Sequence, residues 1–280
     1  MTEEKTDLLN LSSLASALDK STKDGAIVYS DEELEAMRKV KRRLEEEDGL
    51  THINLRFLAY TVIACKNRVD DSVSKYRKFL KAISVCGDGS LTNVETDDDM
   101  WKDPNVESFL RDFYEPCGVD NEGRQILWIN GGDKPITEDM EITSVRAGIL
   151  FTAAIHSDSK SLREGITFVI DTSKQGNKKK IGNESKMQKL NQSYPLRPQS
   201  IYIAGSSYAT RIVINGLIKV ASLFTKQKIL QRLKFVTMEE AVSLVPRESA
   251  PKYVGGKAGG IDDVVEWTKK RYASLPVPDI

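Results

Sequence analysis

A single carboxylate stands where an α/β protein would place a reactive group. Asp171 follows an apolar run, and open α/β sheets bind ligands at the carboxyl ends of their strands. It could hold a metal or act as a nucleophile, but a phosphotransfer loop needs a second Asp near position 173, and a metal-ion adhesion loop needs Ser where Gln175 stands. We therefore interpret Asp171 as a turn-capping residue. An α/β enzyme centred on it ranks last of three hypotheses.

Two other features resemble catalytic or nucleotide sites and lack essential parts. The run Gly255–Gly260 resembles a phosphate cradle, but a Walker loop has the pattern Gly-x-x-x-x-Gly-Lys-Ser/Thr after a strand. A flexible hinge that closes the domain is favoured instead. His156 lies near a predicted helix end, which favours a capping or core histidine, and no Ser/His/Asp or Cys/His arrangement has useful spacing. We expect no enzymatic activity.

The densest basic patch contains three consecutive lysines, Lys178, Lys179 and Lys180. A solvated loop is the favoured interpretation. The alternative is contact with anionic lipid headgroups, worth about 1 kcal/mol per cation and screened by salt.

Composition excludes several classes of function. Among 280 residues, 41 basic residues balance 41 acidic ones, so no global field steers the chain toward nucleic acid. Three cysteines without CxxC spacing and two histidines argue against a disulfide scaffold or a zinc site. We expect the protein to be a monomer that binds no metal and no cofactor. Without a signal-peptide pattern or about 18 uninterrupted apolar residues, we expect a cytosolic protein with at most peripheral, transient membrane contact.

The pattern of apolar residues divides the chain into three parts. Residues 1–30 are polar and weakly periodic, and we expect a mobile segment. Residues 31–90 show helical periodicity, starting at a cap on Ser30 or Asp31, and predict a small helical lobe. After a turn-rich linker, residues 105–275 alternate strand and helix patterns, which predicts an α/β domain with a mixed, mostly parallel sheet. Its predicted strands are 125–130, 166–171, 201–204 and 233–236, and its predicted helices are 138–156, 184–194, 209–224 and 238–245.

The segment 209–224 is unusually apolar. Its polar residues form one thin stripe of Arg211, Asn215, Lys219 and Ser222, and almost everything else is apolar. As a helix of about 24 Å it falls short of the roughly 30 Å needed to cross a membrane. We expect it to cover another apolar surface.

Three motifs in order resemble the CRAL-TRIO lipid-binding family: Gly118–Ile126, Tyr194–Ile203 and Val245–Gly256. Upstream, Leu55–Leu58 and Val69–Val73 resemble the family's N-terminal helical lobe. Together they cover roughly residues 31–260. The resemblance implies a sheet that floors an apolar cavity for one lipid-like molecule, with segment 209–224 as a mobile gate.

The resemblance also assigns expected ligand contacts. Residues that share one strand face by period two would point into the cavity, and those opposite the polar stripe of the gate would face the ligand. For any one of them, ordinary core packing stays an open alternative. These residues are Ile166, Phe168, Ile170, Ile201 and Ile203 on the sheet, and Ile214, Leu217, Ile218 and Ala221 on the gate.

Departures from the family pattern bear on ligand identity. Members that bind phosphatidylinositol have a Glu directly after Tyr-Pro and a Lys in the helix before the closing segment, where this chain has Leu196 and Glu239 or Glu240. Phosphatidylinositol is therefore disfavoured. The leading hypothesis is a cytosolic protein that transfers one lipid or other hydrophobic amphiphile between membranes. The second is a lipid-sensing adaptor that regulates a protein partner without transfer.

Overall fold

The computed structural model describes residues 27–130, 136–173, 184–205 and 231–280. Their helices are α2 (Asp31–Asp48), α3 (Leu55–Ala64), α4 (Val69–Ile83), α5 (Asp97–Trp101), α6 (Val106–Phe113), α7 (Glu141–Ile155), α8 (Ser159–Glu164), α9 (Glu184–Ser193), α12 (Met238–Ser243) and α13 (Val264–Ser274). Their strands are β1 (Ile126–Asn130), β2 (Ile166–Asp171), β3 (Pro198–Ala204) and β4 (Leu233–Val236).

The N-terminal lobe consists of α2, α3 and α4, as the sequence predicts. Helix α2 begins at Ser30, whose hydroxyl accepts from the Glu33 amide while the Glu33 carboxylate accepts from the Ser30 amide. It ends at Gly49, where a φ of 67° suits a residue without a side chain. The apolar faces of the three helices meet, and α4 also packs against α9.

The stretch between the lobe and the first strand contains more helix than its turn-rich sequence indicates. Thr96 caps α5, and the buried Met100 anchors that helix. Helix α6 follows and packs Phe109 and Leu110 against the core.

The sheet has four described strands in the order β1-β2-β3-β4, and every described pair is parallel. The predicted mostly parallel sheet is confirmed, and two isolated antiparallel bridges, Glu115 with Trp128 and Val119 with Gln125, lie beside the parallel strand pairs. Strand β3 begins three residues before its predicted start, because Pro198 occupies its first position, where proline is tolerated.

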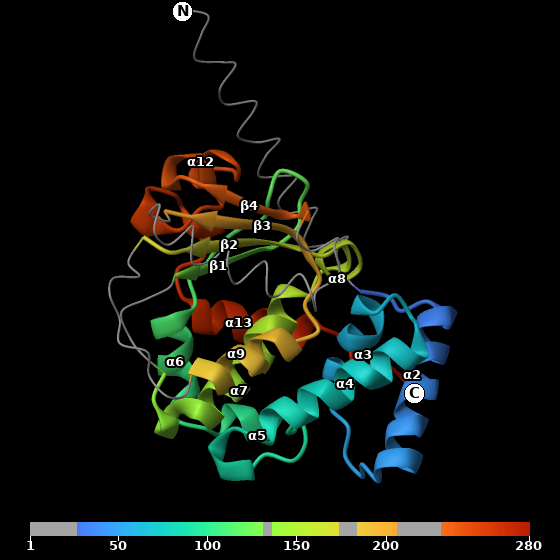
Figure 1. Cartoon of the computed structure of the whole chain (residues 1–280). Coiled ribbons are helices and arrows are strands. Elements are labelled where there is room, and N and C mark those ends of the chain that lie inside the picture. Colours follow the sequence, from blue (N-terminus) through green and yellow to red (C-terminus); the bar gives the residue numbers. More distant parts are fainter. Residues whose placement is uncertain (1–26, 131–135, 174–183, 206–230) are drawn as a thin grey trace, which may run out of the picture.

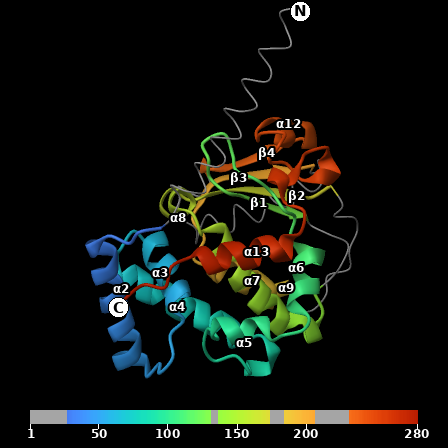
Figure 2. The same ribbon diagram turned by 180° about the vertical axis from the view of Figure 1, so that it is seen from behind.

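Helices cover the sheet on both sides (Figures 1 and 2). Helix α12 lies on one face, and α7, α9 and α13 lie on the other. Helix α7 is buried around nearly its whole circumference, since it lies between the sheet and the N-terminal lobe. The predicted helix 138–156 starts later than expected, after a 3-10 turn at Glu138–Met140.

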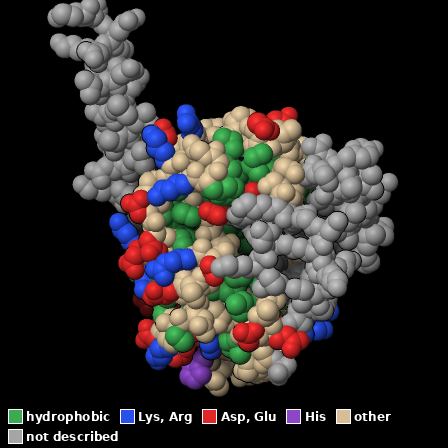
Figure 3. Space-filling model, turned by 90° about the vertical axis from the view of Figure 1, so that its left-hand side faces the viewer, with side chains coloured by type: hydrophobic (Ala, Val, Ile, Leu, Met, Phe, Trp, Pro, Cys, Tyr) green, Lys and Arg blue, Asp and Glu red, His purple; other side chains and the backbone are tan. Residues whose placement is uncertain are grey.

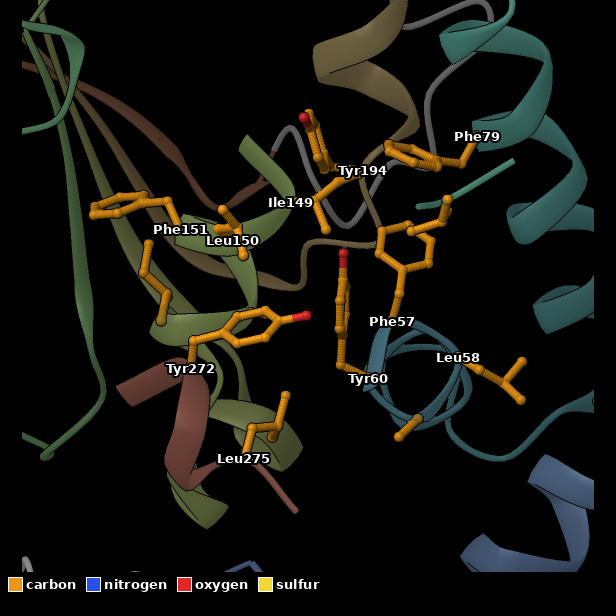
Figure 4. Close-up of a cluster of buried hydrophobic side chains, with 14 of the residues drawn as sticks. Phe57, Leu58, Tyr60, Phe79, Ile149, Leu150, Phe151, Tyr194, Tyr272 and Leu275 are labelled. Carbon is orange, nitrogen blue, oxygen red and sulfur yellow. The ribbon is translucent and has the colours of Figure 1, made fainter. Parts of the chain in front are cut away.

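An aromatic cluster joins the two lobes into one core (Figure 4). Tyr60 on α3 and Tyr272 on α13 approach each other from opposite sides of this core, and Tyr194 lies close by. Phe57 meets Tyr60 edge-on at 4.8 Å, and Phe79 on α4 lies 5.0 Å from Tyr194, measured between ring centroids. Such pairs add about 0.5–1.5 kcal/mol to the gain from burial.

A partly buried ion pair fixes α2 to α8. The Arg163 guanidinium donates two hydrogen bonds to the Glu33 carboxylate, at 2.9 and 2.8 Å, and a third to the Val28 carbonyl. Burial alone would raise the pKa of Glu33, but the hydrogen bonds from Arg163 and Ser30 outweigh it and hold that pKa below its usual value. Glu33 therefore stays charged and bound at neutral pH.

We expect Arg163→Met to lower the free energy of unfolding by about 2 kcal/mol, because it leaves the Glu33 carboxylate without its cation. Urea denaturation followed by circular dichroism measures this change. Arg38→Met is the matched control, since Arg38 pairs with Glu35 where both side chains are about half exposed, and it should cost less than about 0.5 kcal/mol. Equal losses in the two variants would contradict the role given to Arg163.

Candidate functional site

One face of the sheet carries two rows of apolar side chains. Residues paired between parallel strands share a face, so the pairs Phe168–Ile201 and Ile170–Ile203 extend into rows that cross all four described strands. The pairing confirms that Phe168, Ile170, Ile201 and Ile203 share a face, whereas Ile166 lies beyond a shift in register and pairs with Pro198. The rows are Leu127, Phe168, Ile201 and Leu233, and then Ile129, Ile170, Ile203 and Phe235.

The residues of the two rows differ in their neighbours: Ile129 and Ile201 pack against the main core, whereas Leu233 belongs to neither core cluster found among the described residues. Leu127 and Phe168 belong to the main core with the helices, as does Ile166, which is fully buried. At the carboxyl end of the strands, Ile170, Ile203 and Phe235 belong to neither core cluster found among the described residues. We call these three the terminal row. Hydrophobic side chains also reach the surface on one side of the molecule, beside a band of charged residues (Figure 3).

The opposite face of the sheet is covered by residues 241–253, which we call the closing segment or C-terminal segment. Trp128 and Val169 pack there against Ala241, Val245 and Ala250. All five of these side chains are buried, so this face of the sheet exposes no apolar surface at Trp128 or Val169.

A chain of hydrogen bonds locks this closure at the carboxyl edge of the sheet. The Trp128 indole donates to the Tyr253 oxygen at 2.7 Å, and the Tyr253 hydroxyl donates to the Asp171 carboxylate at 2.8 Å. Burial raises the pKa of Tyr253, and the Asp171 charge raises it further, so the phenol keeps its proton. The lock joins β1, β2 and the closing segment.

The turn-capping interpretation of Asp171 is confirmed. Its side chain is 1% exposed, and one carboxylate oxygen accepts from the Ser173 amide at 2.8 Å while the other accepts from Tyr253. Both oxygens thus have structural partners. Within the described ranges, no group of three His, Cys, Asp or Glu is placed to hold a metal ion.

The glycine-rich run forms a set of hydrogen-bonded turns in place of a phosphate cradle. The Gly256 and Ala258 amides donate to the Pro251 and Ala250 carbonyls, at 3.0 and 2.7 Å. Gly259 lies against Gly118 so closely that a side chain at Gly259 would collide with the backbone there. The run therefore packs against the start of the domain, and amides that could bind phosphate are already used.

His156 is a core histidine that caps α7, as the sequence favours. Its Nδ1 lies 2.7 Å from the Thr152 carbonyl oxygen, and its ring stacks on Tyr60 with a centroid separation of 5.6 Å. Burial lowers the pKa of His156, so the ring is neutral at physiological pH. Its 1% exposure removes it from any solvent-accessible site.

The residues that depart from the phosphatidylinositol-binding pattern have structural positions. Leu196 packs against the main core. Glu239 is exposed, and Glu240 caps α12 through a 2.7 Å hydrogen bond from the Thr237 amide. Neither carboxylate supplies the positive charge that an inositol phosphate requires.

Several predicted site residues lie outside the described residues. These are the gate contacts Ile214, Leu217, Ile218 and Ala221 and the basic residues Lys178, Lys179 and Lys180. Their roles stay predictions, as do the ligand contacts assigned to the strands.

Sequence reasoning missed Phe235 and Tyr253. The alternation in Leu233–Val236 was a usable signal for Phe235, because it places Leu233 and Phe235 on one face. Tyr253 gave no comparable signal, since its partners Trp128 and Asp171 are distant in sequence.

Comparison with known proteins supplies one match. The family model for the CRAL/TRIO domain matches residues 114–256, just over half of the chain and the region that holds the sheet and its closing segment. Curated proteins give no match to the chain. Within the described part of the chain, no helix is long and apolar enough to cross a membrane.

We expect Tyr253→Phe to lower the free energy of unfolding by about 1–2 kcal/mol, because it removes the shared partner of the Trp128 indole and the Asp171 carboxylate at a position that is 42% exposed to water. Equilibrium unfolding in urea measures the loss. Tyr202→Phe is the matched control, since no hydrogen bond of the Tyr202 hydroxyl is found among the described residues, and it should change stability by less than about 0.5 kcal/mol. A Tyr253→Phe protein as stable as the control would show that the lock contributes little.

Proposed function

The chain belongs to the CRAL/TRIO domain family, a family of lipid-binding proteins, and we propose that it holds one lipid or other hydrophobic amphiphile and carries it between membranes. The ligand's apolar chain would lie against the terminal row. No covalent bond is made or broken in this process, and the protein acts by sheltering the chain from water.

The terminal row is the observation that carries this proposal. Ile170, Ile203 and Phe235 form an apolar strip at the carboxyl end of parallel strands, where open α/β sheets bind ligands. On β1, β2 and β3, the other residues of this face, Leu127, Ile129, Phe168 and Ile201, pack in or against the core formed with the described helices. Each methylene buried against such a strip gains about 0.8 kcal/mol, so a long chain would bind tightly without any polar contact.

A gate over the terminal row would allow the ligand to enter and leave. The sequence predicts an apolar helix over 209–224, outside the described residues, with a single polar stripe. Such a helix could lie over the ligand when closed and enter a membrane interface when open. The balance between the two positions would set the rate of exchange. The lysines at 178–180 would assist transient contact with anionic membranes.

The expected ligand is an apolar molecule or one with a headgroup other than inositol phosphate. Leu196 is part of the core, and Glu240 is used as a helix cap. Both features support this choice. The buried and fully bonded Asp171 supports a role without catalysis.

We expect Phe235→Ser to lower ligand occupancy and vesicle-to-vesicle transfer about tenfold, because it removes one large apolar contact of the terminal row. Native mass spectrometry measures occupancy after incubation with a cell lipid extract, and transfer of the lipid identified in this way is then measured between vesicles. Protein that binds lipid but does not transfer it would point to the adaptor hypothesis.

Lys234→Ser is the matched control for this experiment. Lys234 precedes Phe235 in the same strand, pairs with Tyr202 and so points to the opposite face, where it is exposed. Its substitution should change occupancy and transfer less than about twofold. If both variants retained full occupancy, the terminal row would not be the ligand floor.

The gate can be tested by two substitutions in the predicted helix. Leu217→Asp, on its apolar side, should abolish transfer because a carboxylate cannot lie against the ligand chain or enter the membrane interface. Ser222→Asp, in the polar stripe, should leave transfer within about twofold of the original rate. The same vesicle assay measures both, and equal rates would remove the gate from the proposal.

A further inference from the structure

A recess lies in the N-terminal lobe, lined by none of the residues of the terminal row. It has a volume of about 240 Å³ and is formed by the end of α3, the following turn and the part of α4 up to Lys78. Its charged residues are Arg68, Asp71, Lys75 and Lys78, and the Cys65 thiol and Ser74 also line it. None of these residues has a part in the proposed lipid site.

The recess has an excess of positive charge. Its one carboxylate, Asp71, is already bound by Arg68, with 2.8 Å between Oδ2 and Nη2. No carboxylate of the described residues lies within 4.0 Å of the ammonium groups of Lys75 or Lys78. The whole chain has equal numbers of acidic and basic residues, so these two cations are a local feature.

The environment of Lys75 is unfavourable for its positive charge. Its ammonium is partly buried and donates to the Gln192 carbonyl at 3.2 Å, a partner that carries no charge. Burial lowers the pKa of Lys75 to about 8, and the neighbouring Lys78 charge contributes to the shift. An anion between the two ammonium groups would remove this repulsion and supply the missing counter-charge.

We propose that this recess binds a phosphate group, carried either by a lipid headgroup or by a small soluble molecule. Phosphate oxygens accept several hydrogen bonds at once, and Lys75 and Lys78 each have ammonium protons to donate. The Ser74 hydroxyl adds a neutral donor at the same wall. The volume accommodates the phosphate together with a few neighbouring atoms.

The position of the recess gives such binding a structural consequence. Lys75 bridges α4 to the last turn of α9, and α9 leads through Tyr194 into β3 of the sheet. A phosphate that binds Lys75 therefore acts at the junction between the N-terminal lobe and the lipid-binding domain (Figure 1).

The test uses the full chain and two probes. Isothermal titration with inorganic phosphate measures soluble phosphate, and flotation with phosphatidylcholine vesicles, with and without phosphatidic acid, measures a lipid phosphate. The double substitution Lys75→Gln with Lys78→Gln should weaken binding at least about tenfold, the equivalent of one charge-assisted hydrogen bond. Lys81→Gln is the matched control, because Lys81 is an exposed lysine of the same helix outside the recess.

The single variant Lys78→Gln tests the site without disturbing the fold. Lys78 is exposed, so its loss should leave the midpoint of thermal unfolding unchanged. It should reduce binding partially. Phe235→Ser should leave phosphate binding intact, which separates this site from the proposed lipid floor.

The alkylation rate of Cys65, which lines the recess, can show whether phosphate binds there. Cys65 is the partly exposed cysteine of the three, whereas Cys86 and Cys117 are buried. Bound phosphate should slow its alkylation in the original protein and have no effect in the double variant.

Two results would support the proposal and identify the source. Binding of both probes that depends on Lys75 and Lys78 indicates that phosphate alone suffices, and dependence seen with phosphatidic acid vesicles alone indicates a lipid headgroup. If neither probe bound, or if the double variant bound as well as Lys81→Gln, the proposal would be overturned.

Discussion

The rest of the structure depends on a constraint of the sheet: parallel strands are apolar on both faces, and both faces must be covered. The C-terminal segment covers one face around Trp128. Among the described residues, the helices cover the other face around Phe168 and Ile129, whereas Ile170, Ile203 and Phe235 belong to neither core cluster. The terminal row completes that second face, and we have proposed that a ligand chain lies against it. On this proposal, the physical requirement that folds the domain would also create its binding surface.

The two faces differ in rigidity for a clear reason. The covered face is fixed by directional bonds, since Tyr253 links Trp128 and Asp171 across two strands. A shared aromatic core and the Arg163–Glu33 pair fix the helical side to the N-terminal lobe. Of the strands that carry the terminal row, β2 is thus bonded directly to Tyr253, while β3 and β4 are held through their parallel pairing with it. Strands that are already ordered lose little conformational entropy when a ligand binds. On the proposed function, motion would then be needed only in the segment that covers the ligand.

Local patterns in the sequence predicted much of this fold. Strands β2 and β4 match their predicted bounds, because each is a short apolar run between polar or turn residues. The start of β3 was missed since Pro198 looks like a break in the strand. Helices α5 and α6 are too short to give a clear period.

The candidate site was only partly predictable, because its assembly depends on pairing between distant segments. The sequence put Ile170 and Ile203 on matching faces, but the pairing of β3 with β4 was needed to add Phe235. The Tyr253 lock and the Arg163–Glu33 pair join residues far apart in the chain, and no local pattern encodes such contacts.

The chemistry of the floor limits what it can select. All residues of both rows are apolar, and beyond the terminal row on β2, the Thr172 hydroxyl donates to the Ala204 carbonyl and is already used. Such a surface distinguishes ligands by chain length and shape, at about 1–3 kcal/mol for each misplaced methylene, and discriminates weakly between headgroups. Strong discrimination requires buried polar groups that the wrong ligand leaves unpaired. If the proposed ligand lies on these rows, its headgroup would therefore be selected by residues other than those of the two rows.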